Sequence, residues 1–176
     1  GLSQINLSAS LGEKIVVVGP SGSGKSSLLK VIAGYYLDQM EGQYYVDDHL
    51  IKINDAENIR QHIAYASQNH TEISASVKDN VIYSENENLD DLKEVLEAVN
   101  LIEEIEELGG SNTLIGEQNQ KTLSGGQRQR ISLARALYAK DVSMILLDEV
   151  TSALDRKNEL HVWKSIFNIA QDKILI

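Results

Sequence analysis

A glycine-rich segment between a strand-like run and a helix-like run constrains this chain more than any other feature. Residues Gly19–Ser26 fit the pattern Gly-x-x-x-x-Gly-Lys-Ser/Thr in full. The β-branched run Lys14–Val18 before it predicts a short strand buried on both faces of a sheet. Leu28, Leu29 and Ile32 after it have helical spacing. Strand, loop and helix in this order indicate an α/β unit that binds phosphate.

The residue types of this loop suit a nucleoside triphosphate. Glycines allow consecutive amides to curl around the β-phosphate, and the helix that follows points its positive end at the same anion. Lys25 is expected at the β- and γ-phosphate oxygens, and the Ser26 hydroxyl at Mg²⁺. The flanking strand and helix disfavour the alternative of a chance Gly/Ser-rich turn. The residues predicted to bind nucleotide are Gly19, Pro20, Ser21, Gly22, Ser23, Gly24, Lys25, Ser26 and Ser27.

Two acids follow an apolar run near the end of the chain. Asp148 and Glu149 come directly after residues 144–147, which predict a buried strand. Ligands of open α/β sheets bind beyond the carboxyl ends of strands, so we expect both acids to face the phosphates. Asp148 would hold the Mg²⁺ shell through water, and Glu149 would polarise the attacking water as general base. The alternative is an acidic helix N-cap after a core strand.

A second glycine pair opens the segment Leu123–Gln127, which reads Leu-Ser-Gly-Gly-Gln. Ser124 predicts a helix N-cap and, with Gln127, a capping box, which favours a purely structural interpretation. However, glycines in a first helical turn disfavour the helix, which indicates that something approaches this backbone closely. The N-terminus of a helix suits a γ-phosphate.

These three motifs, in the chain order Gly19–Ser26, Leu123–Gln127 and Leu147–Glu149, resemble the nucleotide-binding domain of ABC transporters. Ala64–Gln68 resembles the Q-loop of that family, and Ser152–Asp155 resembles its D-loop. Thr113–Glu117 resembles a segment typical of ABC exporters, and so do Ile59–Arg60, Ile63 and Val77–Val81. The resemblance covers essentially the whole chain.

The resemblance implies a single α/β domain with the fold of a P-loop NTPase. A RecA-like core with a mainly parallel sheet is expected at about residues 1–73 and 141–176. A helical subdomain that carries the Leu123–Gln127 signature is expected at about residues 74–140, together with a small antiparallel β portion. Residues 43–47 and 63–67 read as strands, and residues 77–108, 124–139 and 156–170 as mainly helical.

The resemblance also implies an ATP sandwich in a head-to-tail dimer. The P-loop (Gly19–Ser26) of one subunit and the signature of the other would enclose each ATP, through the signature residues Leu123, Ser124, Gly125, Gly126 and Gln127. Gln68 would face the metal and the attacking water and sense a transmembrane partner, and Asp155 would bridge the subunits. The implied Mg²⁺ ligands are Ser26, Gln68 and Asp148, the last through water. Such a domain works on the cytoplasmic face of a membrane, beside a transmembrane domain.

Composition excludes some functions. The formal net charge of −10 argues against a broad nucleic-acid surface, and the absence of cysteine excludes disulfides and thiolate metal sites. No apolar run approaches the roughly 20 residues of a membrane helix. Any membrane contact would therefore involve a partner or another part of the protein.

The chain departs from the family pattern at both ends. The aromatic residue that stacks on adenine is expected before Gly1, and the histidine that contacts the γ-phosphate is expected after Ile176, so the domain is expected to be truncated. The four histidines in the chain are interpreted as surface or packing residues: His49, His62, His70 and His161.

Two alternatives remain within the resemblance. A non-transport ABC ATPase would place long coiled coils between the P-loop half and the signature half, whereas Gln68 and Leu123 are separated by ordinary helical segments. A regulatory module would bind ATP without turning it over, and the retention of Glu149 argues against it. The segment Thr113–Glu117 favours export over import.

Overall fold

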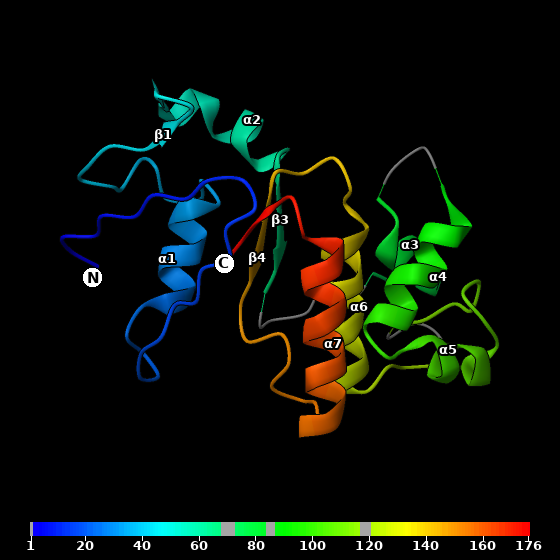
Figure 1. Ribbon diagram of the computed structural model, residues 1–176. Helices are drawn as coiled ribbons and strands as arrows, with labels where there is room; N and C mark the ends of the chain where they lie inside the picture. Colours follow the sequence, from blue (N-terminus) through cyan, green and yellow to red (C-terminus); the bar gives the residue numbers. More distant parts are fainter. Residues whose placement is uncertain (1, 68–72, 84–86, 117–120) are drawn as a thin grey trace. The chain divides into compact units, whose positions relative to one another are not determined.

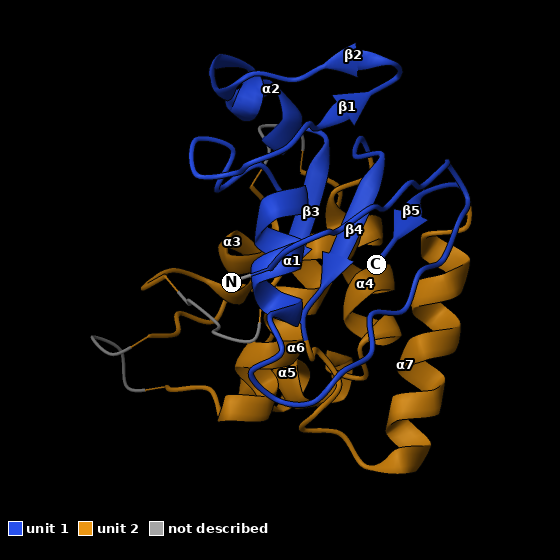
Figure 2. Cartoon of the chain, turned by 90° about the vertical axis from the view of Figure 1, so that its left-hand side faces the viewer, with its two compact units in different colours: residues 1–65, 141–148, 172–176 blue, residues 66–140, 149–171 orange. Residues whose placement is uncertain are grey.

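The computed structural model describes residues 2–67, 73–83, 87–116 and 121–176 (Figure 1). The described chain separates into two compact units, shown in different colours in Figure 2. Unit 1 comprises residues 1–65, 141–148 and 172–176, and unit 2 comprises residues 66–140 and 149–171.

A parallel sheet with a helix on one face forms unit 1. The sheet has the strand order β3 (Ile63–Ala66), β4 (Met144–Leu147), β5 (Ile174–Leu175), and β4 and β5 are parallel. Helix α1 (Lys25–Ile32) places Leu29 and Ile32 in one buried cluster with Leu146 and Ile176. A separate antiparallel pair is formed by β1 (Tyr45–Val46) and β2 (His49–Leu50). These elements confirm the predicted α/β class, including its small antiparallel portion.

The segment before the P-loop differs from the prediction. Within the described residues it forms a single parallel bridge, Lys14 with Leu175, rather than a strand over residues 14–18. Ile15 and Val17 pack against the cluster beside α1. Val16 and Val18 are 82% and 84% exposed, so the expectation of burial on both faces was wrong. The physical reason is that the strand next to this segment, β5, is only two residues long, so it can pair with the segment only near Lys14. There the Leu175 amide donates to the Glu13 carbonyl at 2.9 Å.

Helices with a common apolar core form unit 2. Residues 77–108 contain α3 (Val77–Val81), α4 (Leu89–Ala98) and α5 (Ile102–Leu108), followed along the chain by α6 (Gly125–Tyr138) and α7 (Arg156–Ile169). Helix α6 packs against α3 and α4, and α4 also contacts α5 and α7. The described core side chains that are fully buried here include Leu96, Leu101, Ile105, Ile115, Ile131, Leu133, Leu137 and Ile166.

Polar side chains set the helix boundaries in unit 2. A capping box of Ser76 and Asp79 begins α3, and the Asn88 side chain accepts from the Asp90 and Asp91 amides at the start of α4. Gly109 ends α5 with φ 113°, a left-handed conformation that favours glycine. The continuous helical character read from residues 77–108 is therefore divided into separate helices.

The helical unit begins at residue 66 rather than at about residue 74, its first stretch ends at residue 140 as expected, and it also includes residues 149–171. Helix α7, expected in the core, groups with the helical unit because it packs on α4. No helix among the described residues is both long enough and apolar enough to cross a membrane.

Candidate functional site

The P-loop lies between the bridged segment at Lys14 and helix α1. Gly24, with φ 97°, occupies the N-cap of α1 in the left-handed region, so a side chain at this position would be strained. The Lys25 ammonium donates to the carbonyls of Gly19 (2.9 Å) and Pro20 (3.1 Å), which holds a positive charge against the loop. The helix N-terminus and this ammonium together provide the electrostatics that a phosphate needs.

A buried carboxylate joins the loop to the end of β4. Asp148 is 5% exposed. Its Oδ1 accepts a hydrogen bond from the Ser26 hydroxyl at 3.0 Å, and its Oδ2 accepts one from the Tyr65 hydroxyl at 3.1 Å. Burial, and then the Asp148 carboxylate, raises the pKa of Tyr65 well above its usual range, so the phenol stays protonated and donates. The structure thus brings Ser26 and Asp148 together, as their shared assignment to Mg²⁺ requires.

The donor set fits Mg²⁺ better than a transition metal. Within the described ranges no group of three or more His, Cys, Asp or Glu side chains could hold a metal ion. The Ser26 hydroxyl and the Asp148 carboxylate, which lie at hydrogen-bond distance from each other, would leave most coordination positions of the ion to water and phosphate. This is the usual arrangement for Mg²⁺. Gln68, the third predicted ligand, lies outside the described residues.

Glu149 has an unusual backbone. Its side chain is exposed, and its φ of 54° places a non-glycine residue in the left-handed region. The alternative of an acidic N-cap at Asp148 or Glu149 is wrong, because the N-cap of the next helix, α7, is Asp155. Glu149 is thus an exposed acid that directly follows the buried Asp148.

The signature segment begins α6. Ser124 is the N-cap, its hydroxyl accepts from the Gln127 amide at 3.2 Å, and the Gln127 side-chain carbonyl accepts from the Ser124 amide at 2.8 Å. The predicted capping box is therefore confirmed. Gly125 has no positive φ, and a Cβ built on it would meet nothing within 4 Å. Among the described residues, neither backbone conformation nor packing requires a glycine at that position.

Helix α5 holds the first turn of α6. The Glu104 carboxylate accepts hydrogen bonds from both terminal nitrogens of Arg130, at 2.6 and 3.0 Å. It also accepts one from the side-chain amide of Gln127 at 2.8 Å. Burial opposes ionisation of Glu104, but these donors outweigh it and hold the pKa of its carboxyl below the usual value. Sequence analysis missed this cluster, since Glu104 reads as one of many acids on a solvated helix face.

Glu104→Gln is expected to reduce the pH dependence of stability. Because the folded-state pKa is depressed, Glu104 stabilises the fold above its ordinary pKa of 4.5, and this contribution disappears as the pH falls through the lower folded value. The loss in the variant at about pH 7 should be about 1 kcal/mol or less, since the Glu104 side chain is 37% exposed. Urea unfolding between about pH 7 and about pH 4 measures it. The exposed Glu107→Gln is the control, and equal pH slopes in wild type and Glu104→Gln would contradict the expectation.

The remaining predicted residues have simpler surroundings. Asp155 caps α7 by accepting from the amides of Lys157 (2.9 Å) and Asn158 (3.1 Å), a role that sequence analysis did not assign. These backbone donors lower the pKa of Asp155. His49, His62 and His161 are exposed, as expected, and His70 lies outside the described residues.

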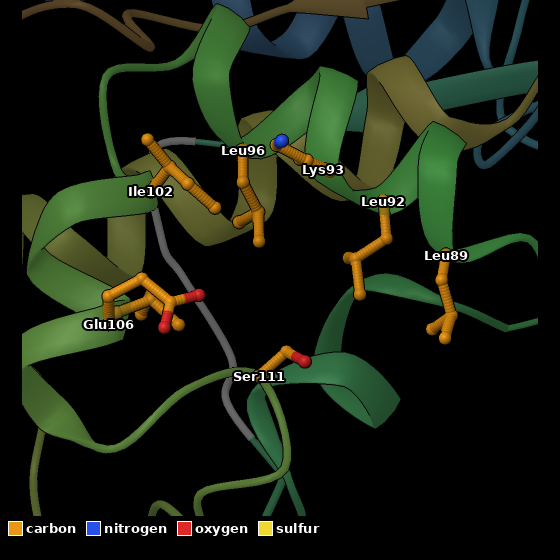
Figure 3. A pocket seen from close by; sticks show the side chains of 8 residues that line it. Leu89, Leu92, Lys93, Leu96, Ile102, Glu106 and Ser111 are labelled. Atoms are coloured by element: carbon orange, nitrogen blue, oxygen red, sulfur yellow. The ribbon is translucent and has the colours of Figure 1, made fainter.

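The described part of unit 2 also has a pocket of about 460 Å³ between α4, α5 and Ser111 (Figure 3). Leu92 and Leu96 point into it. Its lining is otherwise mainly leucine and isoleucine, and Lys93 supplies the one cation among the lining residues. A triphosphate needs several donors and a compensating charge, so this pocket is no nucleotide site.

Comparison with known proteins agrees with this geometry. The sequence pattern of the family described as ABC transporter matches residues 2–152. A P-loop before α1, with Ser26 hydrogen-bonded to Asp148 at the end of β4, defines an ATP-binding domain of this class. The chain belongs to the ABC transporter family, and membership implies that it binds ATP.

Curated relatives are much longer than this chain. It is 41% identical over 162 residues to the ATP-dependent lipid A-core flippase of Paraburkholderia xenovorans (strain LB400), covering 92% of this chain and 27% of the relative. It is 38% identical over 179 residues to ABC transporter B family member 29, chloroplastic, of Arabidopsis thaliana (99% and 28%). It is 35% identical over 179 residues to the Toxin RTX-I translocation ATP-binding protein of Actinobacillus pleuropneumoniae (99% and 25%). The chain thus spans between a quarter and a third of these relatives.

Proposed function

We propose that this chain is the ATP-hydrolysing domain of an ABC exporter, at the cytoplasmic face of a membrane and coupled to a transmembrane domain. The observation that supports this most directly is the Ser26 hydroxyl on the buried Asp148 carboxylate, beside Lys25, in a chain of this family. Relatives named as a lipid A-core flippase and as a toxin translocation protein support export.

The residues of unit 1 would hold the triphosphate. The amides of the P-loop and the N-terminus of α1 bind the β-phosphate, and Lys25 moves its ammonium from the Gly19 and Pro20 carbonyls to the phosphate oxygens. Ser26 and Asp148 would hold Mg²⁺, with Asp148 acting through water. When bound, the ion neutralises charge on the phosphate oxygens.

Glu149 would orient and deprotonate the attacking water. The Glu149 residue is exposed, whereas Asp148 is buried with its carboxylate held by Ser26 and Tyr65. The two neighbouring acids therefore suit different roles, one for the metal shell and one for the base. Gln68 is proposed as a second water- and metal-facing residue.

A second copy of the domain would complete the site. In the proposed head-to-tail dimer, the capped N-terminus of α6 in one copy faces the γ-phosphate bound to the other, through Ser124, Gly126 and Gln127. Gly125 supports this arrangement, because the space beside it is open in the part of the chain that the structure describes, and nothing there explains the glycine. Asp155 would lie at the same dimer interface. Hydrolysis would then open the dimer and move the transmembrane partner.

Turnover in the intact protein tests the proposal. Reconstituted in lipid vesicles, it should hydrolyse MgATP, and the rate should not change when DNA is added. Binding of ATP without turnover would overturn the proposal in favour of a regulatory module. Turnover that depends on DNA would overturn it in favour of a non-transport ABC ATPase.

A further inference from the structure

One buried polar residue of α6 lies outside every motif that sequence analysis used. Gln129 is 3% exposed. Its amide nitrogen donates to the Glu149 carbonyl at 2.6 Å and to the Ser152 hydroxyl at 3.0 Å. Its amide oxygen accepts from the Ala153 amide at 3.3 Å. All three bonds reach the short segment 149–153.

Glu149, whose carbonyl accepts the 2.6 Å hydrogen bond from Gln129, has a strained backbone. A φ of 54° at a non-glycine residue costs roughly 1–2 kcal/mol and persists only where the surroundings hold it. The Glu149 carbonyl accepts from Gln129 and, at 3.4 Å, from the Ser152 amide. Because φ and ψ set the direction of the Cα–Cβ bond, the bonds that hold this peptide also set the direction in which the Glu149 side chain leaves the backbone.

Helix α6 holds Gln129 in a fixed position. Its first turn is closed by the Ser124–Gln127 capping box and anchored through Gln127 and Arg130 to Glu104. Close packing continues between the helix and the segment after Glu149, since a Cβ built on Gly126 would lie 3.6 Å from the Ala153 Cβ. Gln129 therefore connects the signature helix to the backbone of Glu149.

We propose that Gln129 is a positioning residue for ATP hydrolysis: through the Glu149 carbonyl it holds the Glu149 carboxylate in the direction needed to act on water. The inference rests on the proposed function, in which Glu149 is the general base. Gln129 itself would touch neither ATP nor water.

Gln129→Met tests the positioning role in the intact protein. Methionine has a similar length but neither donates nor accepts in this way, so the three bonds disappear with little change in volume. A base misplaced by about 1 Å can lower the rate about 100-fold, so turnover should fall roughly 10- to 100-fold. The KM for ATP should stay within about 2-fold, because binding belongs to the P-loop. Gln129→Glu, which keeps the length and the acceptor but loses both donors, should show the same loss.

A double-mutant comparison separates positioning from general loosening of the fold. In the Glu149→Gln background, single-turnover hydrolysis of radiolabelled ATP should change less than about 2-fold on adding Gln129→Met, because the group that Gln129 positions is already gone. A merely structural defect would multiply with Glu149→Gln instead. Ser132→Ala removes another buried polar group of α6 and is the matched control, expected to turn over ATP like wild type.

The outcomes distinguish this inference from the proposed function. Wild-type turnover that is lost in Glu149→Gln but kept in Gln129→Met and Gln129→Glu would overturn the positioning role alone. Multiplicative loss in the double variant would also overturn it. A wild-type protein without turnover, or one in which Glu149→Gln has no effect, would instead overturn the assignment of Glu149 as the base.

Discussion

Replacing Glu149 with glutamine is expected to lower ATP turnover at least about 100-fold while leaving ATP binding intact, since a positioned general base contributes roughly 10²–10⁴-fold. The substitution removes the base but keeps the size of the side chain. The P-loop contacts of Lys25 and Ser26 lie elsewhere and should not change. ATP should then accumulate in the bound state and hold two copies of the domain together.

Light scattering with and without MgATP measures this second consequence. The variant should be monomeric alone and dimeric with MgATP. The exposed Glu107→Gln, on α5, is the control and should turn over ATP like wild type. A Glu149→Gln variant that still hydrolyses ATP at the wild-type rate would exclude Glu149 as the base. A variant that binds ATP but stays monomeric would contradict the composite site.

Lys25→Ala should lower the affinity for ATP roughly 10- to 100-fold. A charge-assisted hydrogen bond contributes about 1.5–3 kcal/mol, and 1.4 kcal/mol is a factor of ten in affinity. In the structure the ammonium already lies on the P-loop, bonded to Gly19 and Pro20, so it has only a short distance to move to a phosphate. Titration of a fluorescent ATP analogue measures the affinity.

Lys30→Ala is the matched control for the lysine of the P-loop. Lys30 lies in the last turn of the same helix, after the predicted nucleotide-binding residues Gly19–Ser27, so its removal should leave the affinity for ATP unchanged. Thermal unfolding of both variants shows whether α1 remains folded. Equal affinity in wild type and Lys25→Ala would contradict the assignment of the phosphate site.

Much of the fold follows from local patterns. The P-loop, the helix after it and the strand β4 appear where residue types and spacing predicted them. The capping box at Ser124 was also readable, because its partners are three residues apart. The strand at residues 14–18 was overestimated, since β-branched composition reports a preference, whereas a strand also needs a partner along its length.

Of the contacts in the candidate site, one was expected from the sequence and another was not. Proximity of Ser26 and Asp148 was expected from the rule that ligands gather at the carboxyl ends of strands, and the 3.0 Å bond agrees with it. Nothing in the pattern indicated Tyr65 as the second partner of Asp148. A tyrosine in a strand can serve in packing as well as in hydrogen bonding. Which polar atom its hydroxyl contacts depends on the strand that lies beside it.

The sequence by itself determined the family, the phosphate-binding loop and the acids, because each lies within a few consecutive residues whose chemistry is local. The tertiary structure decided what holds those residues in place. Tyr65 meets Asp148 from 83 positions away, Gln129 meets Glu149 from 20, and Arg130 meets Glu104 from 26. Such pairs depend on how strands align and helices pack, and a hydrogen bond over that separation leaves no periodic trace in the chain.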